Sequence, residues 1–318
     1  MPFAQVAVGG GGRGVSRVVV LGPQRRPTVD AVLRTVDRTG PIGVVNAGWQ
    51  EREPDDAELD GLLDGRSVNL RLYARWLDVL EQDPEYAAAE REHRAALAER
   101  QELYLVQLAG VLGALREVAR YGGSRAEVRE PARVDAEAAV RLVDERHLTR
   151  MREAHAAFEA LWRPGERAAV ARHREAVRQR LDGVPTLVFT GGHVGVLLHV
   201  LQLFAVTRPP VVVAWSAGAM ALTERVLLFH DRAPHGPAHA EFAAPGLGWL
   251  TGCVLLPHAR RRLHTEDPAR MAELAVRAAP ARCVVLDDGT RLDLDGASLP
   301  NSARVVAADG RIGEGVAG

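Results

Sequence analysis

The sequence contains no lysine, so all 40 of its basic residues are arginines. A Walker A phosphate loop, a Schiff base, pyridoxal phosphate chemistry and a Ser–Lys hydrolase all depend on a lysine amine. Those classes are therefore excluded. The 41 acidic residues leave a formal net charge of −1, which gives no electrostatic reason to expect nucleic acid as a partner.

Cysteine is almost as scarce, and long apolar runs are missing. Cys253 and Cys283 lie in apolar settings without Cys-x-x-Cys spacing, so we expect two small buried hydrophobic residues in a reducing compartment. The amino-terminal residues Met-Pro-Phe-Ala do not resemble a signal peptide. No apolar stretch approaches the length needed to span a bilayer. We therefore expect a cytoplasmic protein with no membrane partner.

Charge is distributed unevenly along the 318 residues. Residues 51–182 hold 22 of the 40 basic residues and 27 of the 41 acidic ones, although they make up well under half of the chain. Such a shift in composition predicts a separate, solvent-exposed module. The sequence therefore predicts an α/β domain from 1–50 and 183–318, interrupted by a charged α-helical insertion at 51–182.

A helical leucine pattern supports the predicted insertion. Leu105, Leu108, Leu112 and Leu115 recur at steps of three and four residues, which places them on one stripe that packs against another helix. Pro131 and the pair at 164–165 punctuate the region into four or five expected helices. We expect the insertion to cap the site or to form a homo-oligomer, because the stripe needs a surface to cover it.

The flanking segments instead contain short runs rich in β-branched residues, several of them followed by a small residue and a helical stretch. Continuous apolar strands that alternate with helices predict a doubly wound, mostly parallel sheet covered on both faces. Ligands bind such sheets at the carboxyl ends of the strands. We therefore expect the chemistry just after Val45, Phe189, Ala214 and Leu286, where the runs 42–45, 186–189, 211–214 and 283–286 end.

A glycine-rich stretch at residues 9–14 formally satisfies the Gly-x-Gly-x-x-Gly pattern of dinucleotide-binding proteins. That pattern must open a helix, whereas the residues that follow are another apolar, strand-like run. We expect a connection here and no nucleotide cofactor.

The strongest local motif is Val213-Ala214-Trp215-Ser216-Ala217-Gly218. An apolar strand that runs into a serine flanked by small residues, and then into a helix, is typical of a nucleophile elbow. Ala214 replaces the first glycine of the Gly-x-Ser-x-Gly pattern. The alternative is that Ser216 only caps the helix.

A serine nucleophile needs a base, and the base needs an orienting acid. An apolar run brings His258 to the end of a strand, 42 residues after Ser216, and we expect it to be the base. Asp288 follows the last interior strand and is the preferred acid, with Asp231 as the alternative. Either aspartate could equally be a turn residue.

Two further clusters need an interpretation. Gly191, Gly192 and His193 follow a strand end, where a backbone N–H of the Gly-Gly turn could join that of Ala217 in an oxyanion hole. A plain strand-to-helix turn explains the glycines equally well. His230, Asp231, His235 and His239 could be drawn as metal ligands, but prolines and a glycine interrupt them, so they share no helical face. We expect neither a metal nor an organic cofactor.

Together these motifs resemble the serine peptidase family that contains dipeptidase E and cyanophycinase, within the class I glutamine-amidotransferase-like superfamily. The similar segments are Phe189-Thr190-Gly191-Gly192, Trp215-Ser216-Ala217-Gly218-Ala219, Pro245-Gly246-Leu247-Gly248 with Leu256-Pro257-His258, and Leu286-Asp287-Asp288-Gly289-Thr290. They cover roughly 17–50 and 183–300. Residues 51–182 have no counterpart, and Arg291 stands where a small residue is usual.

The resemblance implies a doubly wound α/β fold with Ser216 as nucleophile and His258 as base. It places Asp288 where the family often has a glutamate and Asp231 where some members are assigned the acid. The Gly192 and Ala217 amides would form the oxyanion hole.

We therefore expect a serine hydrolase that cleaves an amide bond of a small peptide. Family members often act on aspartyl peptides, and Arg232 or Arg260–Arg262 could hold a substrate carboxylate bidentately. The expected substrate-contacting residues are Gly191, His193, Trp215, Arg260 and Arg262. One alternative is an esterase of the α/β-hydrolase type, although no histidine follows His264. The other is a catalytically silent binding protein on the same fold.

Overall fold

A six-stranded sheet forms the centre of the molecule in the computed structural model, which describes residues 17–25, 27–36, 39–123, 125–230, 239–295 and 299–314. The strand order is β10-β1-β5-β4-β2-β3. All neighbours are parallel except β10, which runs antiparallel to β1 at the edge. The strands are β1 (Arg17–Leu21), β2 (Ile42–Val45), β3 (Ser67–Asn69), β4 (Thr186–Phe189), β5 (Val211–Trp215) and β10 (Arg291–Asp295).

Two smaller sheets adjoin the central one. The four-stranded sheet has the order β12-β11-β9-β8, and the two-stranded sheet pairs β6 with β7. Their strands are β6 (Arg225–Leu228), β7 (Glu241–Pro245), β8 (Cys253–Pro257), β9 (Arg282–Leu286), β11 (Arg304–Val306) and β12 (Ile312–Glu314). The run 283–286 is thus a strand, as predicted, but it belongs to the smaller sheet, because β10 already occupies the edge of β1.

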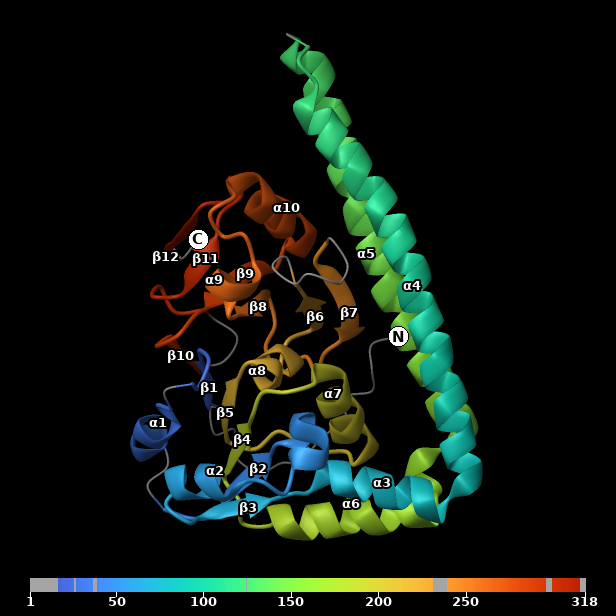
Figure 1. The fold of residues 1–318 in the computed structure, drawn as a ribbon, viewed down its shortest axis with the longest axis vertical. Coiled ribbons are helices and arrows are strands. Elements are labelled where there is room, and N and C mark those ends of the chain that lie inside the picture. The colour runs from blue at the N-terminus through green and yellow to red at the C-terminus, as the bar shows by residue number, and fades with distance from the viewer. Residues whose placement is uncertain are drawn as a thin grey trace.

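Helices cover both faces of the central sheet, which confirms the predicted doubly wound α/β fold (Figure 1). Alternate residues of one strand point to opposite faces, because side chains in a strand have a period of two. Val19 packs in the cluster with α1 and α2, whereas Val18 packs in the cluster with α3, α6, α7 and α8. The helices on these faces are α1 (Val29–Val36), α2 (Ala57–Leu62), α3 (Leu72–Gln82), α6 (Ala168–Leu181), α7 (Val194–Leu203) and α8 (Ala217–Ala221).

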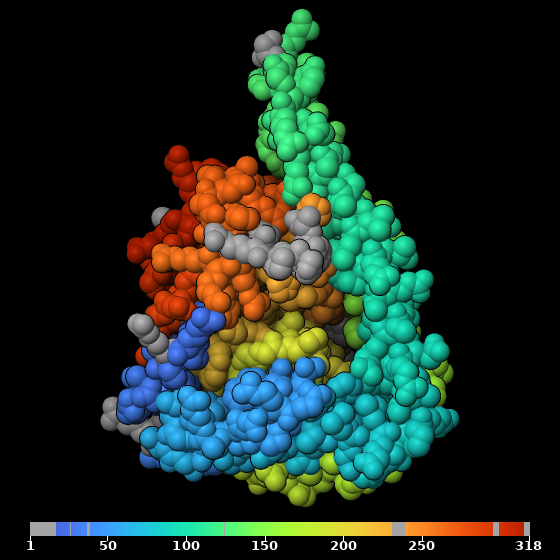
Figure 2. Space-filling view, in the orientation of Figure 1, coloured from blue at the N-terminus to red at the C-terminus, as the bar shows by residue number. Residues whose placement is uncertain are grey.

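Two 37-residue helices, α4 (Pro84–Arg120) and α5 (Ala126–Trp162), form an antiparallel hairpin along one side of the molecule. Its free end projects beyond the body (Figures 1 and 2). The predicted leucine stripe faces the partner helix: Leu108, Leu112 and Leu115 are buried, and Leu105 packs against them. The short helices α9 (Ala259–Arg262) and α10 (Pro268–Ala278) and the 3-10 turns η1 (Ala47–Arg52) and η2 (Pro164–Glu166) complete the list.

Residues 51–182 differ from their sequence-based description in two places. The strand β3 pairs parallel with β2, so this stretch contributes to the central sheet as well as to the helices. Pro131 was expected to end a helix, but it lies within α5. Its neighbours in the first turns of α5 are exposed, so water can satisfy the carbonyl group that loses its hydrogen-bond donor. The pair Pro164–Gly165 does end α5, as predicted.

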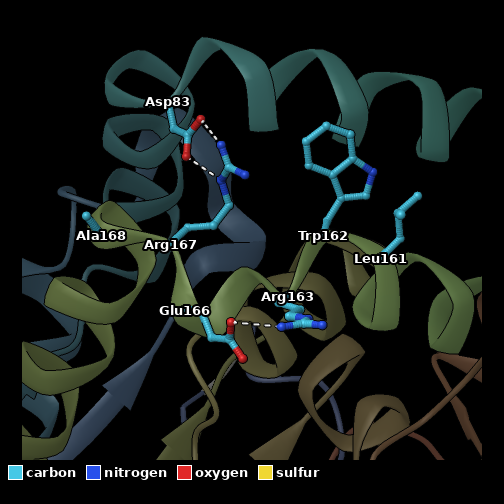
Figure 3. A pocket seen from close by; sticks show the side chains of 7 residues that line it. All are labelled: Asp83, Leu161, Trp162, Arg163, Glu166, Arg167 and Ala168. Carbon is cyan, nitrogen blue, oxygen red and sulfur yellow. Dashed lines mark hydrogen bonds and ion pairs between the residues drawn. The ribbon is translucent and has the colours of Figure 1, made fainter.

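A corner at the base of the hairpin joins the α3–α4 turn to the start of α6. Asp83 caps α4 by accepting from Tyr86 N, and it also accepts a hydrogen bond from Arg167 Nη2 at 2.7 Å. Arg163 pairs with Glu166 at 3.5 Å (Figure 3). A cavity of about 560 Å³ opens at this corner, beside the exposed Leu161 and the indole of Trp162. Since its charged side chains already pair with one another, the corner is a structural junction.

A buried ion pair ties the hairpin to the body. Arg277 of α10 and Asp144 of α5 are each only 1% exposed, and their side chains meet at 2.9 and 3.0 Å. Tyr104 of α4 donates its hydroxyl to Asp144 Oδ1 at 2.6 Å and accepts from Phe242 N of β7. The hairpin is therefore joined to α10 and β7 by charge-assisted hydrogen bonds as well as by apolar contacts. No helix of the described ranges is long and apolar enough to cross a membrane.

Candidate active site

Ser216 sits at the turn between β5 and α8, at the carboxyl end of a central strand. Its backbone has φ 50° and ψ −124°, a conformation that is strained for a residue with a side chain. The turn is tight because Gly218 N donates to Thr190 O at 2.8 Å, and a Cβ on Gly218 would lie 2.5 Å from that oxygen. This is the geometry of a nucleophile elbow, and the Ser216 side chain makes no capping hydrogen bond to α8.

His258 lies at the end of β8 and reaches Ser216. The distance between Ser216 Oγ and His258 Nε2 is 3.1 Å. His258 adopts the left-handed backbone conformation with φ 59°, and its backbone N–H donates to Leu286 O at the end of β9. The parallel pair β8–β9 therefore sets the position of the imidazole, and two predicted residues that are 42 positions apart meet at hydrogen-bond distance.

Burial lowers the pKa of His258 below its ordinary value of 6.5. The positive charges of Arg262 and Arg261 lower it further, whereas the carboxylate of Asp288 raises it. Desolvation disfavours the charged form of an imidazole, and nearby cations add to that effect. The imidazole is therefore neutral near pH 7, the form that can accept a proton from a serine hydroxyl.

No acidic side chain of the described residues contacts His258 in the way that His258 contacts Ser216. The charge of Asp288 acts on His258, but no hydrogen bond joins the two side chains in the part of the chain that the structure describes. Asp288 is exposed, whereas its neighbour Asp287 accepts from Arg260 N and lies 3.5 Å from Arg260 Nε. Asp231 lies outside the described residues. The structure thus brings together a Ser–His pair, and the assignment of Asp288 as the acid stays a prediction.

The predicted glycine turn lies directly beside Ser216. Gly192 has φ +109°, and a Cβ there would overlap the carbonyl group of Gly48. Gly48 O accepts from His193 N at 2.8 Å, and Thr190 N donates to Val45 O, so the turn is held against the end of β2. Within the described residues, the N–H groups of Gly192 and Ala217 have no hydrogen-bond acceptor. Two free N–H groups near the Ser216 hydroxyl are compatible with the predicted oxyanion hole, which stays a prediction.

A cavity of about 200 Å³ opens over the Ser–His pair. Its lining combines Gly191, Gly192 and Ala217 with apolar side chains. The lining residues are Gly191, Gly192, Val194, Ser216, Ala217, Met220, Leu228, Phe229, Pro257, His258 and Arg262. An apolar wall beside two free amides is suited to a small substrate whose polar group faces the amides.

Some of the predicted substrate-contacting residues line the cavity, and others lie elsewhere. Arg262 lines the cavity, and no ion pair to it occurs among the described side chains. Arg260 points toward Asp287 and is largely exposed. His193 caps α7 by accepting from Val196 N at 3.2 Å, and Trp215 lines a second cavity next to Gly192.

Some of the lining residues were not identified from the sequence. Leu228 and Phe229 reach the cavity from the end of β6, which no local motif indicated. Gly48, which supports the glycine turn, follows the strand end at Val45 where chemistry was expected, so its position offered a signal. Of the residues weighed as metal ligands, Asp231 and His235 lie outside the described ranges, as do Arg232 and the stretch 9–14. Within those ranges no three histidine, cysteine or acidic side chains are grouped as metal ligands.

The lowered pKa of His258 predicts the pH dependence of any reaction at Ser216. Activity should rise with pH as the imidazole loses its proton, with the midpoint of kcat/KM below pH 6.5. Arg262→Gln removes a positive charge that lowers this pKa, so the midpoint should move to higher pH. Arg260→Gln is the matched control, because Arg260 is an exposed arginine close in the sequence that pairs with Asp287. Profiles measured with an uncharged substrate check this, and equal midpoints in both variants would contradict it.

No protein-family model matches the sequence, and a comparison with curated proteins finds no match. Among solved structures, the chain is similar to a peptidase from an acI-B1 Actinobacterium, with 12% sequence identity and a TM-score of 0.41. The similarity covers 92% of this chain and 87% of the peptidase chain. The function of the site has to be inferred from its own residues and their geometry.

Proposed function

We propose that this protein is a serine hydrolase that cleaves an amide bond of a small peptide. The observation that carries the proposal is the 3.1 Å contact between Ser216 Oγ and His258 Nε2, at a serine whose backbone is held at φ 50°. A serine that only capped a helix would bond to the helix N–H groups, and Ser216 does not. A neutral imidazole at this distance is suited to activate the hydroxyl.

In the proposed reaction, His258 takes the proton of Ser216 as Oγ attacks the carbonyl carbon of the amide. The N–H groups of Gly192 and Ala217 donate to the negatively charged oxygen of the tetrahedral intermediate. The intermediate collapses when His258 gives its proton to the leaving amine, and an acyl-serine remains. A water molecule then attacks the acyl carbon while His258 takes its proton, and return of that proton to Ser216 releases the acid.

The charge of Arg262 favours a peptide that carries a carboxylate near the scissile bond. A guanidinium group binds a carboxylate through two parallel hydrogen bonds, and that of Arg262 has no ion-pair partner among the described residues. A free carboxyl terminus or an aspartyl side chain would supply this group. The proposed substrate is therefore a short peptide with a carboxylate near the scissile bond, such as a dipeptide with a free carboxyl terminus.

Labelling with a fluorophosphonate probe, followed by intact-mass spectrometry, tests for an activated Ser216. We expect one adduct on the wild-type protein and none on Ser216→Ala. Absence of the adduct across a range of pH would favour a binding protein without catalytic activity. A panel of dipeptides and simple esters then distinguishes a peptidase from an esterase.

Replacement of Arg262 tests the carboxylate preference. We expect Arg262→Gln to raise KM for a dipeptide with a free carboxyl terminus by roughly 10- to 100-fold, the value of a charge-assisted hydrogen bond. The carboxamide form of the same dipeptide should be affected little. Arg260→Gln serves as the control, because Arg260 already pairs with Asp287. An equal rise in KM for the free dipeptide and for its carboxamide form would show that Arg262 does not recognise the substrate carboxylate.

A further inference from the structure

A second cavity, of about 440 Å³, lies next to the candidate active site. Gly192 lines both cavities, and Trp215 of the second cavity directly precedes Ser216. The other lining residues follow the ends of β1 and β2 or belong to α1 and α2. The cavity therefore opens at the carboxyl edge of the central sheet, on the other side of the glycine turn from His258.

Five apolar side chains line the buried part of this second cavity. Val29, Leu59 and Trp215 are 1%, 6% and 7% exposed, and all three belong to one core cluster. Trp49 and Leu62 are half-buried and pack against that cluster. Two indoles and three aliphatic side chains therefore form a wall that a hydrophobic group can contact.

The charged lining residues stay near the solvent. Arg52 and Asp55 form a loose pair at 3.6 Å, with side chains 81% and 65% exposed, and Glu58 is also exposed. They form a polar rim around an apolar floor, which is the usual construction of a binding pocket. A charged ligand group would lose its hydration on entering the floor and would meet no buried counter-charge among the described lining residues.

The position of Trp49 is linked to the catalytic turn. Trp49 follows Gly48, whose carbonyl oxygen accepts a hydrogen bond from the backbone N–H of His193 at 2.8 Å. The backbone N–H of Trp49 donates to Asn46 O, also at 2.8 Å. The same short segment thus supports the Gly192 turn on one side and supplies a wall of the second cavity on the other. Trp49 and Gly192 line the same cavity, so a group bound against Trp49 would lie near the glycine turn.

We propose that the second cavity binds an aromatic or large apolar side chain of the residue that adjoins the scissile amide. This inference rests on the proposed function and narrows its substrate class to peptides that pair a carboxylate with a bulky hydrophobic residue. Trp49, Leu62 and Trp215 are the residues that determine this specificity.

The test compares the dipeptides Phe-Ala, Ala-Phe and Ala-Ala as substrates. We expect one of the two phenylalanyl peptides to exceed Ala-Ala in kcat/KM by about 10- to 100-fold, as burial of an aromatic side chain would give. Trp49→Ala should reduce that ratio, and Leu62→Trp, which fills the cavity, should abolish it. The readout is the ratio to Ala-Ala measured within each variant, so a loss that affects all three dipeptides equally does not change it.

Trp162→Ala is the matched control, since Trp162 is also a partly buried indole beside a cavity but lies at the base of the hairpin (Figure 3). It should leave the ratio unchanged. Equal kcat/KM for all three dipeptides in the wild type would overturn the inference and leave the proposed function standing.

A binding measurement keeps the two proposals separate. Calorimetric titration of Ser216→Ala with the same dipeptides does not depend on turnover. Tighter binding of a phenylalanyl peptide than of Ala-Ala, lost in the double variant with Leu62→Trp, would support the pocket even if no peptide were cleaved. Equal affinities would refute it, whereas failure of the fluorophosphonate to label the wild type would count only against the proposed function.

Discussion

Ser216→Ala is expected to lower kcat for peptide hydrolysis by roughly 10⁴- to 10⁶-fold, because the reaction loses its nucleophile while the oxyanion donors remain. KM should change little, since the Ser216 hydroxyl contributes mainly to the chemical step. Ser302→Ala is the control, as Ser302 is exposed and distant in the sequence from the elbow. Steady-state rates on one dipeptide check the difference. Comparable activity in Ser216→Ala and the wild type would remove Ser216 from the mechanism.

The backbone of Ser216 offers an independent readout of the same site. A residue with a side chain at φ 50° and ψ −124° is strained by about 1–3 kcal/mol. Ser216→Gly relieves that strain and should raise the free energy of unfolding relative to Ser216→Ala, whereas we expect neither variant to be active. Such a gain in stability with a loss of function is typical of a residue held for catalysis. Denaturant titration of the two variants measures it.

The second large effect concerns the ion pair that holds the hairpin. Asp144→Ala should lower the free energy of unfolding by about 3–5 kcal/mol, because it leaves the guanidinium of Arg277 buried without its counter-charge. Burial by itself lowers the pKa of Arg277, and the hydrogen bonds and charge of Asp144, together with smaller contributions from Tyr104 and Glu273, more than offset this. Tyr104 would also lose the acceptor of its hydroxyl.

Asp135→Ala is the matched control for Asp144→Ala, since Asp135 is an exposed aspartate on the same helix. It should change the free energy of unfolding by less than about 0.5 kcal/mol. A double replacement, Asp144→Leu with Arg277→Met, should recover much of the loss because no charge stays buried. If Asp144→Ala and Asp135→Ala unfold at the same denaturant concentration, the ion pair does not stabilise the docked hairpin.

The predicted strands and the leucine stripe show which elements the local sequence pattern can predict. The apolar runs at 42–45, 186–189, 211–214 and 283–286 all form strands, as their continuous β-branched composition predicted for strands buried on both faces. Leu108, Leu112 and Leu115 are buried because steps of three and four residues place them on one side of a helix. Both features depend on residues that are close together in the sequence, so the sequence alone predicts them.

Other elements could not be predicted locally. The strand Ser67–Asn69 is short and partly polar, and it forms only because β2 offers it a parallel edge. The strand Arg282–Leu286 joins a separate sheet because the antiparallel strand Arg291–Asp295 occupies the position beside β1. Pro131 stays within a helix because its surroundings are exposed to water. Each outcome depends on partners that are distant in the sequence.

The candidate site also has features that the local sequence determined and features that only the tertiary structure determined. The residues of the sequence determined that a strand would deliver Ser216 to a tight turn, that another would end at His258, and that no lysine chemistry was available. Only the tertiary structure decided that these two side chains lie 3.1 Å apart, and that His193 caps a helix while Arg262 faces the cavity. Local patterns set which residues end a strand, whereas distances between strand ends depend on how the sheets pair.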